Sequence, residues 1–538
     1  MAPIMFAALV VFLLLGYPVA FALAANGLMF GLIGIELGQF QPNFLQALPE
    51  RVYGTMNNDV LLAIPFFTFM GLVLERSGMA EDLLDTIGQV FGPVRGGLAY
   101  AVIFVGALLA ATTGVVAASV ISMGLISLPI MLRYGYDRRL ATGVIAASGT
   151  LAQIIPPSLV LIVMADQLGR SVGDMYEGAF IPGLVLSGLY AFYVFLVSMI
   201  FPKAAPGLPL EARVLREPDG SSGLPSLGVV VVLSGLVGYF VMRESGLKAG
   251  ADFVILAMSV GVVTSFVIAV LNRLLRLKLL SRLAEQAVFV MVPPLALIFL
   301  VLGTIFIGVA TPTEGGAMGA VGAIVLALMK KRLTVDLLRQ AVESTAKLSS
   351  FVLFILLGAR VFSLTFYGVD GHKWVEELLV GLPGGQTGFL IVVNILVFLL
   401  AFFLDFFELA FIVVPLLGPA AERLGIDLIW FGVILAVNMQ TSFMHPPFGF
   451  SLFFLRSVAP KSPYVDKITK KTMDPVTTGQ IYKGAIPFVV IQCIMIALVI
   501  LFPSMVMHYK GAASTVDPNS IQIDIPGMDM PDLGPPKF

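Results

Sequence analysis

The sequence predicts an all-α protein that crosses a membrane many times, and three observations support this fold class. Of the 538 residues, 58% are hydrophobic and only 12% are charged, whereas soluble domains carry about a quarter charged residues. Apolar runs of roughly 20 residues, long enough for a membrane-spanning helix, recur along the whole chain. Two distant stretches also share an ordered series of short motifs. This composition excludes a soluble enzyme, and a net charge of −1 without a basic stripe excludes a nucleic-acid-binding protein.

The few sulfur and imidazole side chains predict neither a disulfide nor a transition-metal site. Cys493 is the only cysteine, so an intrachain disulfide cannot form. The three histidines, His372, His445 and His508, lack the spacing of zinc ligands. No Walker A motif occurs, which favours an ion gradient over ATP as the energy source of any transport.

The first apolar run, residues 4–35, predicts a single membrane helix bent near Gly16-Tyr17-Pro18. A cleaved signal peptide is the alternative, because Ala22-Leu23-Ala24 resembles a cleavage site. However, no Lys or Arg precedes Arg51, so the positively charged start of a signal peptide is missing. We therefore expect the run to remain in the protein as its first helix.

The other apolar spans follow at short intervals, and the basic residues between them predict an orientation. The spans are 60–76, 96–113, 115–132, 140–165, 178–201, 227–242, 252–272, 285–310, 315–329, 348–368, 386–404, 406–422, 428–455 and 485–503. Lys and Arg gather in connections 273–282, 330–332 and 456–471, which the positive-inside rule places in the cytoplasm. All three connections can lie in the cytoplasm only if two span pairs, 96–113/115–132 and 386–404/406–422, are re-entrant hairpins. The N-terminus is then expected in the cytoplasm and the C-terminus outside.

The motif series indicates an inverted repeat. Gly135-Tyr136-Asp137 precedes Pro156-Pro157, and Gly425-Ile426-Asp427 precedes Pro446-Pro447 with the same step from aspartate to proline. The predicted organisation is a first repeat 1–201 with hairpin 96–132 and broken helix 140–165, a connector 202–310 with extra helices, a second repeat 311–503 with hairpin 386–422 and broken helix 428–455, and an external, disordered tail 504–538.

The double prolines are expected to open their helices, because proline lacks an N–H and clashes with the preceding turn. Non-helical backbone at membrane depth is tolerated only where protein buries it or a cavity adjoins it. Hairpins and broken helices in inverted repeats are typical of secondary transporters. The alternative is that each Pro-Pro pair only kinks a packing helix.

At this point the sequence resembles a known family, the large membrane subunit of tripartite ATP-independent periplasmic (TRAP) transporters. The resemblance covers nearly the whole chain outside 202–282 and the tail. It rests on Ile64-Pro65-Phe66-Phe67, Gly135-Tyr136-Asp137, Ile154-Ile155-Pro156-Pro157-Ser158, Ser171-Val172-Gly173-Asp174 with Ile181-Pro182-Gly183, Thr311-Pro312-Thr313-Glu314 and Pro446-Pro447-Phe448-Gly449.

The resemblance implies a sodium-driven, elevator-type importer of small organic acids in the bacterial inner membrane. It implies two partners: a periplasmic substrate-binding protein and a small membrane subunit of four helices, expected here as a separate chain. It needs no cofactor besides Na⁺ as the coupling ion. The sodium sites that it implies comprise Thr112, Thr113, Gly114, Gly149 and Pro156 for one ion, and Asp405, Thr441, His445 and Pro446 for the other. His445 departs from the family, in which threonine is usual there.

Ionisable residues at membrane depth are functional candidates, because inserting them costs free energy. Arg360 lies in an otherwise uncharged stretch and is predicted to bind the substrate carboxylate through its bidentate guanidinium. Asp405, three positions before Glu408, is assigned to the substrate site as well as to the second sodium, and Ser158 completes the substrate set. The alternative for Arg360 and Asp405 is a structural ion pair. Glu314 is expected to cap a helix or to take part in gating.

Two other functions remain open from the sequence. The first is a self-sufficient sodium/dicarboxylate-type symporter that shares the inverted repeat but needs no binding protein. The second is an intramembrane enzyme, for which His445 near Thr441 would be the only nucleophile–base pair.

Overall fold

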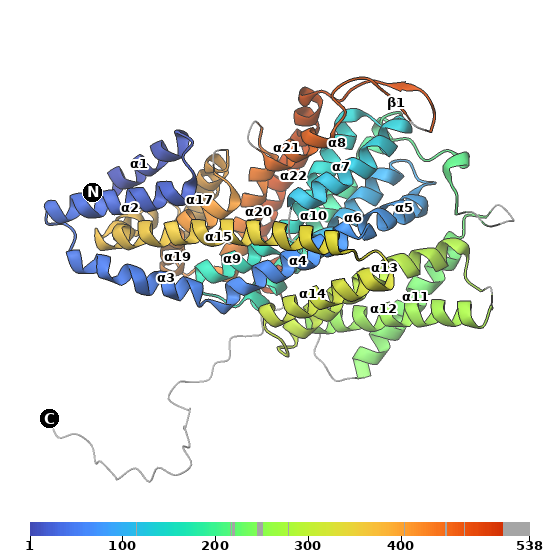
Figure 1. The fold of residues 1–538 in the computed structure, drawn as a ribbon, viewed down its shortest axis with the longest axis horizontal. Coiled ribbons are helices and arrows are strands. Elements are labelled where there is room, and N and C mark those ends of the chain that lie inside the picture. Colours follow the sequence, from blue (N-terminus) through green and yellow to red (C-terminus); the bar gives the residue numbers. More distant parts are fainter. Residues whose placement is uncertain are drawn as a thin grey trace, which may run out of the picture.

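The chain folds almost wholly into α-helices, as its apolar runs predict (Figure 1). The computed structural model describes residues 1–113, 116–215, 217, 221–244, 251–277, 279–402, 404–446, 449–466 and 468–508. Within these ranges, nine helices are long and apolar enough to cross a membrane, or eleven if two bent helix pairs each count as one span. The predicted all-α fold with many membrane spans is confirmed.

The helices fall into two series and a middle segment. The first series is α1 (Ala2–Leu14), α2 (Val19–Glu36), η1 (Pro42–Ala47), α3 (Leu48–Met56), η2 (Asp59–Leu62), α4 (Ala63–Arg76), α5 (Met79–Phe91), α6 (Gly97–Thr113), α7 (Val116–Arg133), α8 (Arg138–Thr150), η3 (Leu151–Gln153), α9 (Leu159–Leu168) and α10 (Val172–Ile200). The middle segment is η4 (Leu210–Ala212), α11 (Leu224–Glu244), α12 (Ala251–Leu274) and α13 (Arg282–Phe306).

The second series is α14 (Pro312–Met329), α15 (Val335–Gly368), α16 (Gly371–Val380), α17 (Gly385–Leu400), α18 (Phe406–Glu408), η5 (Leu409–Val413), α19 (Val414–Arg423), α20 (Leu428–Gln440), η6 (Thr441–Met444), α21 (Phe450–Val458), α22 (Thr478–Leu501) and α23 (Ser504–Met507). The short strands β1 (Tyr464–Val465) and β2 (Thr472–Met473) pair antiparallel between α21 and α22. Helix α23 opens the stretch predicted as a disordered tail, and residues 509–538 of that tail lie outside the described residues.

The first apolar run forms two antiparallel helices, so the prediction of one bent helix over 4–35 is wrong. The chain reverses at Gly16, whose φ of +81° lies in the left-handed region that glycine tolerates. Pro18 then starts α2. The Asn26 side chain donates a hydrogen bond to the Met5 carbonyl at 3.2 Å, which ties the two helices side by side. The left-handed Gly16 allows the turn, and the contact between Asn26 and Met5 holds the two helices together, whereas a proline alone would only kink a helix.

The two series exchange helices. Helix α2 packs along α15 of the second series, and α14 packs along α4 of the first. Glycines allow the backbones to approach closely: a Cβ on Gly27 would lie 2.8 Å from the Val361 carbonyl oxygen, and one on Gly358 would collide with Ala20. Each half therefore supplies one helix that packs along a helix of the other half.

Each segment predicted as a re-entrant hairpin forms a pair of helices whose open ends are linked by a hydrogen bond. At the first, the Leu98 N–H at the start of α6 donates to the Tyr136 hydroxyl beyond the end of α7, at 3.1 Å. At the second, the Gln386 amide at the start of α17 donates to the Leu424 carbonyl beyond α19, at 2.7 Å. In Figure 1, α6 and α7 lie toward the right end of the molecule, and α17 and α19 toward the left.

The ribbon of β1 and β2 is fastened to the first hairpin by an ion pair. The Arg133 guanidinium, at the end of α7, lies 2.9 Å from the Asp466 carboxylate. Hydrogen bonds from Arg133 and Thr469 hold the pKa of the Asp466 carboxyl well below its usual range. The group is therefore charged at neutral pH, where the pair contributes fully to stability, and this contribution is lost only in strong acid.

A Gly143→Val substitution is expected to destabilise the fold, because α8 and α22 meet there backbone to backbone. An added Cβ at Gly143 would collide with the Gly484 carbonyl, whereas one at Gly188 on the outer face of α10 meets nothing within 4 Å. Overpacking of this kind costs about 1–3 kcal/mol. Thermal unfolding of the purified protein in detergent checks this: Gly143→Val should lower the midpoint and Gly188→Val should not. Equal midpoints would contradict the close packing of α8 on α22.

Candidate functional site

The first double proline interrupts the helix, as the sequence predicts. Helix α8 ends at Thr150, one 3₁₀ turn follows, and α9 begins only at Leu159. The buried Ser158 caps α9 and donates a hydrogen bond from its hydroxyl to the Gln153 carbonyl at 2.6 Å. From α10, the Tyr176 hydroxyl donates to the Ser158 carbonyl at 3.4 Å. Hydrogen bonds from the Ser158 and Tyr176 hydroxyls therefore fix the backbone of this break.

The second double proline lies at an equivalent interruption. Helix α20 ends at Gln440, a 3₁₀ turn follows, and α21 begins at Phe450. The Thr441 hydroxyl donates to the Asn438 carbonyl at 2.7 Å. Pro446 lies within the break, after the 3₁₀ turn, and Pro447 and Phe448 lie outside the described residues.

His445 lies between the second break and the tip of the second hairpin. Its ring centroid is 4.4 Å from that of Phe398 and 4.2 Å from that of Phe402, on which it stacks. The side chain is buried, and neither ring nitrogen has a hydrogen-bond partner among the described residues. These contacts place His445 at the tip of the second hairpin, and its role as a sodium ligand stays a prediction.

A buried polar network joins the two breaks. The Thr150 hydroxyl accepts hydrogen bonds from the Gln440 amide at 3.0 Å and the Gln492 amide at 3.4 Å. Gln492 on α22 also donates to the Tyr190 hydroxyl of α10 at 2.9 Å. The sequence analysis missed these residues, although each places an uncharged polar group in an apolar run.

Several oxygen atoms beside the breaks are buried without a hydrogen-bond partner among the described residues. They belong to Ser148, Gln153, Asn438, Gln440, Ser442 and Gln492. Buried polar atoms are nearly always satisfied in folded proteins, by protein groups, ordered water or an ion. Amide and hydroxyl oxygens are also ligands that hard cations accept. The two breaks therefore offer the chemistry of a cation site.

The structure describes only some of the predicted sodium ligands. At the first site, Gly149 and Pro156 are buried. Thr112 and Thr113 lie in the last turn of α6, but their side chains, and all of Gly114, lie outside the described residues. This set of ligands stays a prediction.

Asp405 caps the start of the short helix α18. Its carboxylate accepts a hydrogen bond from the Glu408 N–H at 2.9 Å, and the Glu408 carboxylate accepts one from the Asp405 N–H at 2.9 Å. This capping box starts α18. Asp405 forms no ion pair with Arg360, so the structural pair considered from the sequence is absent between these two described residues.

Arg360 instead lines a crevice of about 390 Å³ that α3, α9, α15 and α19 surround. The other charged groups of the crevice are Arg51, Asp166 and Glu422. Both acids are engaged: Asp166 accepts a 2.6 Å hydrogen bond from Asn58, and Glu422 pairs with Arg170 at 3.1 Å. Among the described residues, no hydrogen bond or ion pair engages the Arg360 guanidinium.

The three predicted substrate residues do not share one pocket. Phe351, more than two helical turns before Arg360 on α15, contacts Phe407 next to the hairpin tip, with ring centroids 6.3 Å apart. Asp405, two residues before Phe407, therefore lies close to the part of α15 that holds Phe351. Arg360 lies farther along the same helix. Ser158 is buried in the first break. Only Arg360 of the three lines the crevice, and the substrate role of all three stays a prediction.

Glu314 forms a capping box with Thr311 at the start of α14, as the helix-cap interpretation expects. The Thr311 N–H donates to the Glu314 carboxylate at 2.8 Å, and the Glu314 N–H donates to the Thr311 hydroxyl at 3.3 Å. The neighbouring Thr313 hydroxyl donates to the Asp59 carbonyl at 2.6 Å, which fixes the start of α14 to η2, the turn before α4.

Comparisons with known proteins agree with one another. The sequence profile of one family, the tripartite ATP-independent periplasmic transporter, DctM component, matches residues 6–284 and 274–505. The C4-dicarboxylate TRAP transporter large permease protein DctM of Pseudomonas aeruginosa is 27% identical over 470 residues, which cover 86% of this chain and 89% of that protein. The isethionate TRAP transporter permease protein DctMQ of Oleidesulfovibrio alaskensis is 23% identical over 85% of this chain, which spans 60% of its length.

Among solved structures, the YdaH transporter of Alcanivorax borkumensis, described as having an unusual topology, is similar with a TM-score of 0.52. The match covers 91% of this chain and 98% of that one at 12% sequence identity, so it indicates a shared fold.

Proposed function

The chain belongs to the DctM family of tripartite ATP-independent periplasmic transporters, and we propose that it imports a small organic acid into bacteria together with sodium ions. Its multi-pass helical fold accords with this family's place in the inner membrane. The observation that carries the proposal is Arg360, whose guanidinium has no ion-pair or hydrogen-bond partner among the described residues and lies in a polar crevice between helices of the two halves. An anionic substrate would satisfy this group.

The crevice supports an acid as the substrate. The names of the two relatives include C4-dicarboxylate and isethionate, and both of these compounds are anions. A guanidinium binds such groups through two parallel hydrogen bonds. Arg51 lines the same crevice from α3, and Ser363 and Tyr367 add neutral polar groups from α15. In the proposed function, Arg360 and Arg51 receive the acid before it moves toward Ser158 and Asp405.

Sodium as the coupling ion is supported by the buried oxygens beside both breaks that have no hydrogen-bond partner in the described part of the chain. Thr441, His445 and Pro446 lie at the second break, and Gly149 and Pro156 at the first. Inward movement of each net positive charge gains about 2.3 kcal/mol per 100 mV of membrane potential. An excess of sodium over substrate charge would therefore favour accumulation.

We propose an elevator mechanism in which two parts move against each other. The moving part comprises both hairpins, both broken helices, α10 and α22, and α2, α4, α14 and α15 form the fixed part. The exchange of α2 and α14 between the halves supports an inverted repeat of 1–201 and 311–503, with 202–310 as the connector. The crevice around Arg360 lies where α15 of the fixed part faces α9 and α19 of the moving part.

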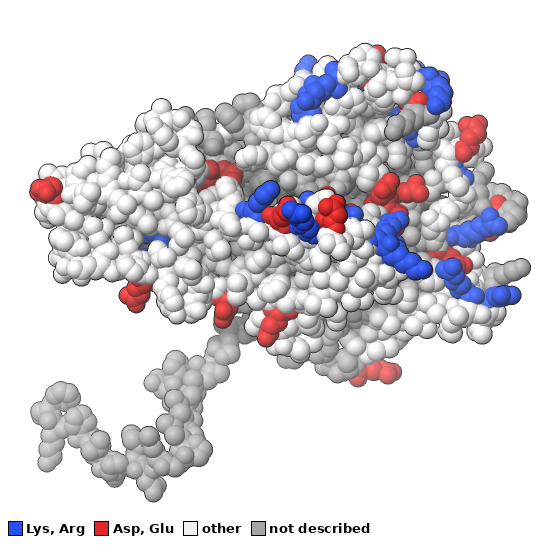
Figure 2. All heavy atoms as spheres, viewed as in Figure 1, with Lys and Arg blue, Asp and Glu red and all other residues white. Residues whose placement is uncertain are grey.

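The proposed orientation places the basic end of the molecule in the cytoplasm. Figure 2 shows several Lys and Arg side chains over the end that holds α5, α7 and β1, and few over α1 and α2. The N-terminal label lies at the opposite end from β1 in Figure 1. Because α1 folds back on α2, we propose a periplasmic N-terminus in place of the cytoplasmic one expected from a single first helix.

The family is tripartite, so we propose that a small four-helix membrane subunit and a periplasmic binding protein complete the transporter. The isethionate relative, named DctMQ, extends well beyond the part that matches this chain. For this protein we propose a separate small subunit. The intramembrane-enzyme alternative gains no support, because the Thr441 hydroxyl donates to the Asn438 carbonyl and His445 stacks on Phe402.

Reconstitution tests the proposal. The acid that co-purifies with the binding protein is identified by mass spectrometry, and its radiolabelled form is supplied to liposomes that hold this chain with or without the partners. We expect uptake only with both partners and an inward sodium gradient. Equal uptake in a potassium gradient would contradict sodium coupling. Full uptake without the binding protein would favour the self-sufficient symporter.

A further inference from the structure

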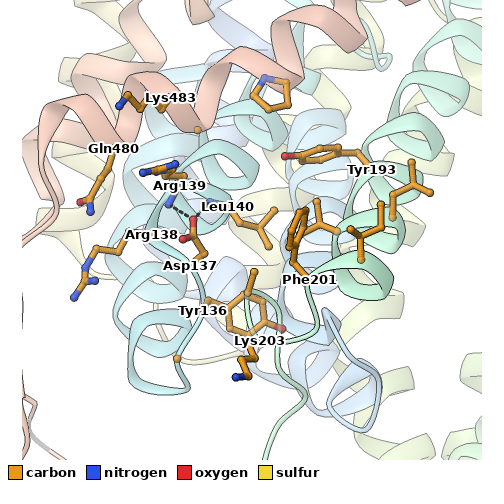
Figure 3. Close-up of a pocket in the computed structure, with 17 residues that line it drawn as sticks. Tyr136, Asp137, Arg138, Arg139, Leu140, Tyr193, Phe201, Lys203, Gln480 and Lys483 are labelled. Atoms are coloured by element: carbon orange, nitrogen blue, oxygen red, sulfur yellow. Dashed lines mark hydrogen bonds between the residues drawn. The ribbon is translucent and has the colours of Figure 1, made fainter.

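A second pocket, of about 990 Å³, opens between α8, α10 and α22, apart from the breaks and the Arg360 crevice (Figure 3). Four basic side chains line it: Arg138, Arg139, Lys203 and Lys483. They come from the start of α8, the segment after α10 and the first turns of α22. Residues distant in the sequence thus place positive charge around a single cavity.

These positive charges are poorly neutralised. The Asp137 carboxylate, the one acid of the lining, accepts hydrogen bonds from the Arg139 and Leu140 N–H groups at 2.8 and 3.2 Å and so caps α8. Arg138 pairs at 3.3 Å with Asp474, whose side chain is 81% exposed. The Arg138 Nε is buried without an acceptor among the described residues. Arg139, Lys203 and Lys483 form no ion pair within the described part of the chain.

The remaining wall of the pocket is apolar. Tyr193, Leu196, Val197, Ile200 and Phe201 line it from α10 and its end, and Pro487 lines it from α22. Both helices are long and apolar enough to span a membrane. Ile200 and Phe201 are 64% and 63% exposed, so this wall continues into the outer surface of α10. The cavity thus combines a cationic rim with an apolar surface open to lipid.

We propose that this pocket binds an anionic phospholipid of the cytoplasmic leaflet, with cardiolipin as the occupant. Its two phosphates would contact Arg139, Lys203 and Lys483, and its acyl chains would lie along Leu196 and Ile200. Basic pockets between membrane helices bind such headgroups. A free phosphate would leave the apolar wall uncovered, and a zwitterionic lipid would leave the cations unneutralised. A headgroup with two phosphates matches the surplus of basic side chains.

Binding to the full-length protein tests the proposal. The purified chain in detergent is titrated with cardiolipin, phosphatidylglycerol or phosphatidylethanolamine, and bound lipid is counted by native mass spectrometry. The variant Arg139→Gln/Lys203→Gln/Lys483→Gln removes three cations of the pocket. The control Lys331→Gln/Lys347→Gln/Lys461→Gln removes three exposed cations elsewhere. Each Lys or Arg near an anionic lipid contributes roughly fivefold to affinity.

Wild type and control are expected to bind cardiolipin more tightly than phosphatidylethanolamine. The pocket variant is expected to bind cardiolipin roughly a hundredfold more weakly than wild type does. Equal cardiolipin binding by the pocket variant and the control would overturn the proposal. Displacement of the lipid by millimolar inorganic phosphate would overturn it too, because the site would then recognise a free anion. If the triple variant does not fold, cardiolipin binding is compared between two single variants. These are Lys203→Gln, in the exposed segment after α10, and its control Lys461→Gln.

Discussion

An Arg360→Lys variant is expected to lose more than tenfold of its uptake while the protein still inserts and folds. The side chain keeps its charge but loses the planar fork that binds both oxygens of a carboxylate. A hydrogen bond to a charged group contributes about 1.5–3 kcal/mol, which corresponds to a loss of roughly tenfold or more. Uptake into liposomes that contain all three components measures the effect.

The matched control for this variant is Arg339→Lys. Arg339 is on the same helix, α15, but it pairs with Glu343 on the exposed surface at 2.8 Å and does not line the crevice. It should keep wild-type uptake, since exposed pairs contribute little. Wild-type uptake by Arg360→Lys would remove Arg360 from the substrate route. A loss of folded protein in Arg360→Lys alone would instead assign Arg360 a structural role.

Cross-linking the hairpin tip to α15 is expected to abolish transport. The Phe351 and Phe407 rings, with centroids 6.3 Å apart, belong to the fixed and the moving part of the proposed elevator. In a Cys493→Ser background, the pair Phe351→Cys/Phe407→Cys can be joined by a short, reducible, thiol-specific reagent. Uptake should fall to background after cross-linking and return after reduction, because the moving part is released again.

A pair within the fixed part provides the control. The Phe21 and Phe354 rings of α2 and α15 lie 5.3 Å apart, and both side chains are exposed. Cross-linking Phe21→Cys/Phe354→Cys should leave uptake unchanged, since α2 and α15 are not proposed to move relative to each other. Full uptake by the cross-linked Phe351→Cys/Phe407→Cys protein would rule out sliding of the hairpin along α15.

The parts of the fold that the sequence predicts well are those determined by local backbone chemistry. Each double proline removes helical hydrogen bonds wherever it stands, so both interruptions follow from the residues alone. The first helix shows the limit of this reasoning. Whether Gly16 and Pro18 bend or reverse the chain depends on the packing of Asn26 against Met5, which no local pattern contains.

The candidate site is less predictable, because its geometry depends on contacts between distant segments. The link from Thr150 to Gln440 and Gln492 crosses most of the chain. One missed feature did have a sequence signal. Asp405 and Glu408 have the spacing of a capping box, and the sequence analysis noted this spacing without predicting the cap.

The exchange of α2 and α14 has a consequence for biogenesis. During synthesis the first half enters the bilayer before α14 and α15 exist, so the faces of α4 and α2 that they will cover are solvated by lipid in the interim. Lipid must leave these faces when the later helices arrive from the translocon. Assembly therefore ends with the second half, and a ribosome that stalls after α13 leaves a membrane intermediate in which acyl chains still cover these faces of α2 and α4.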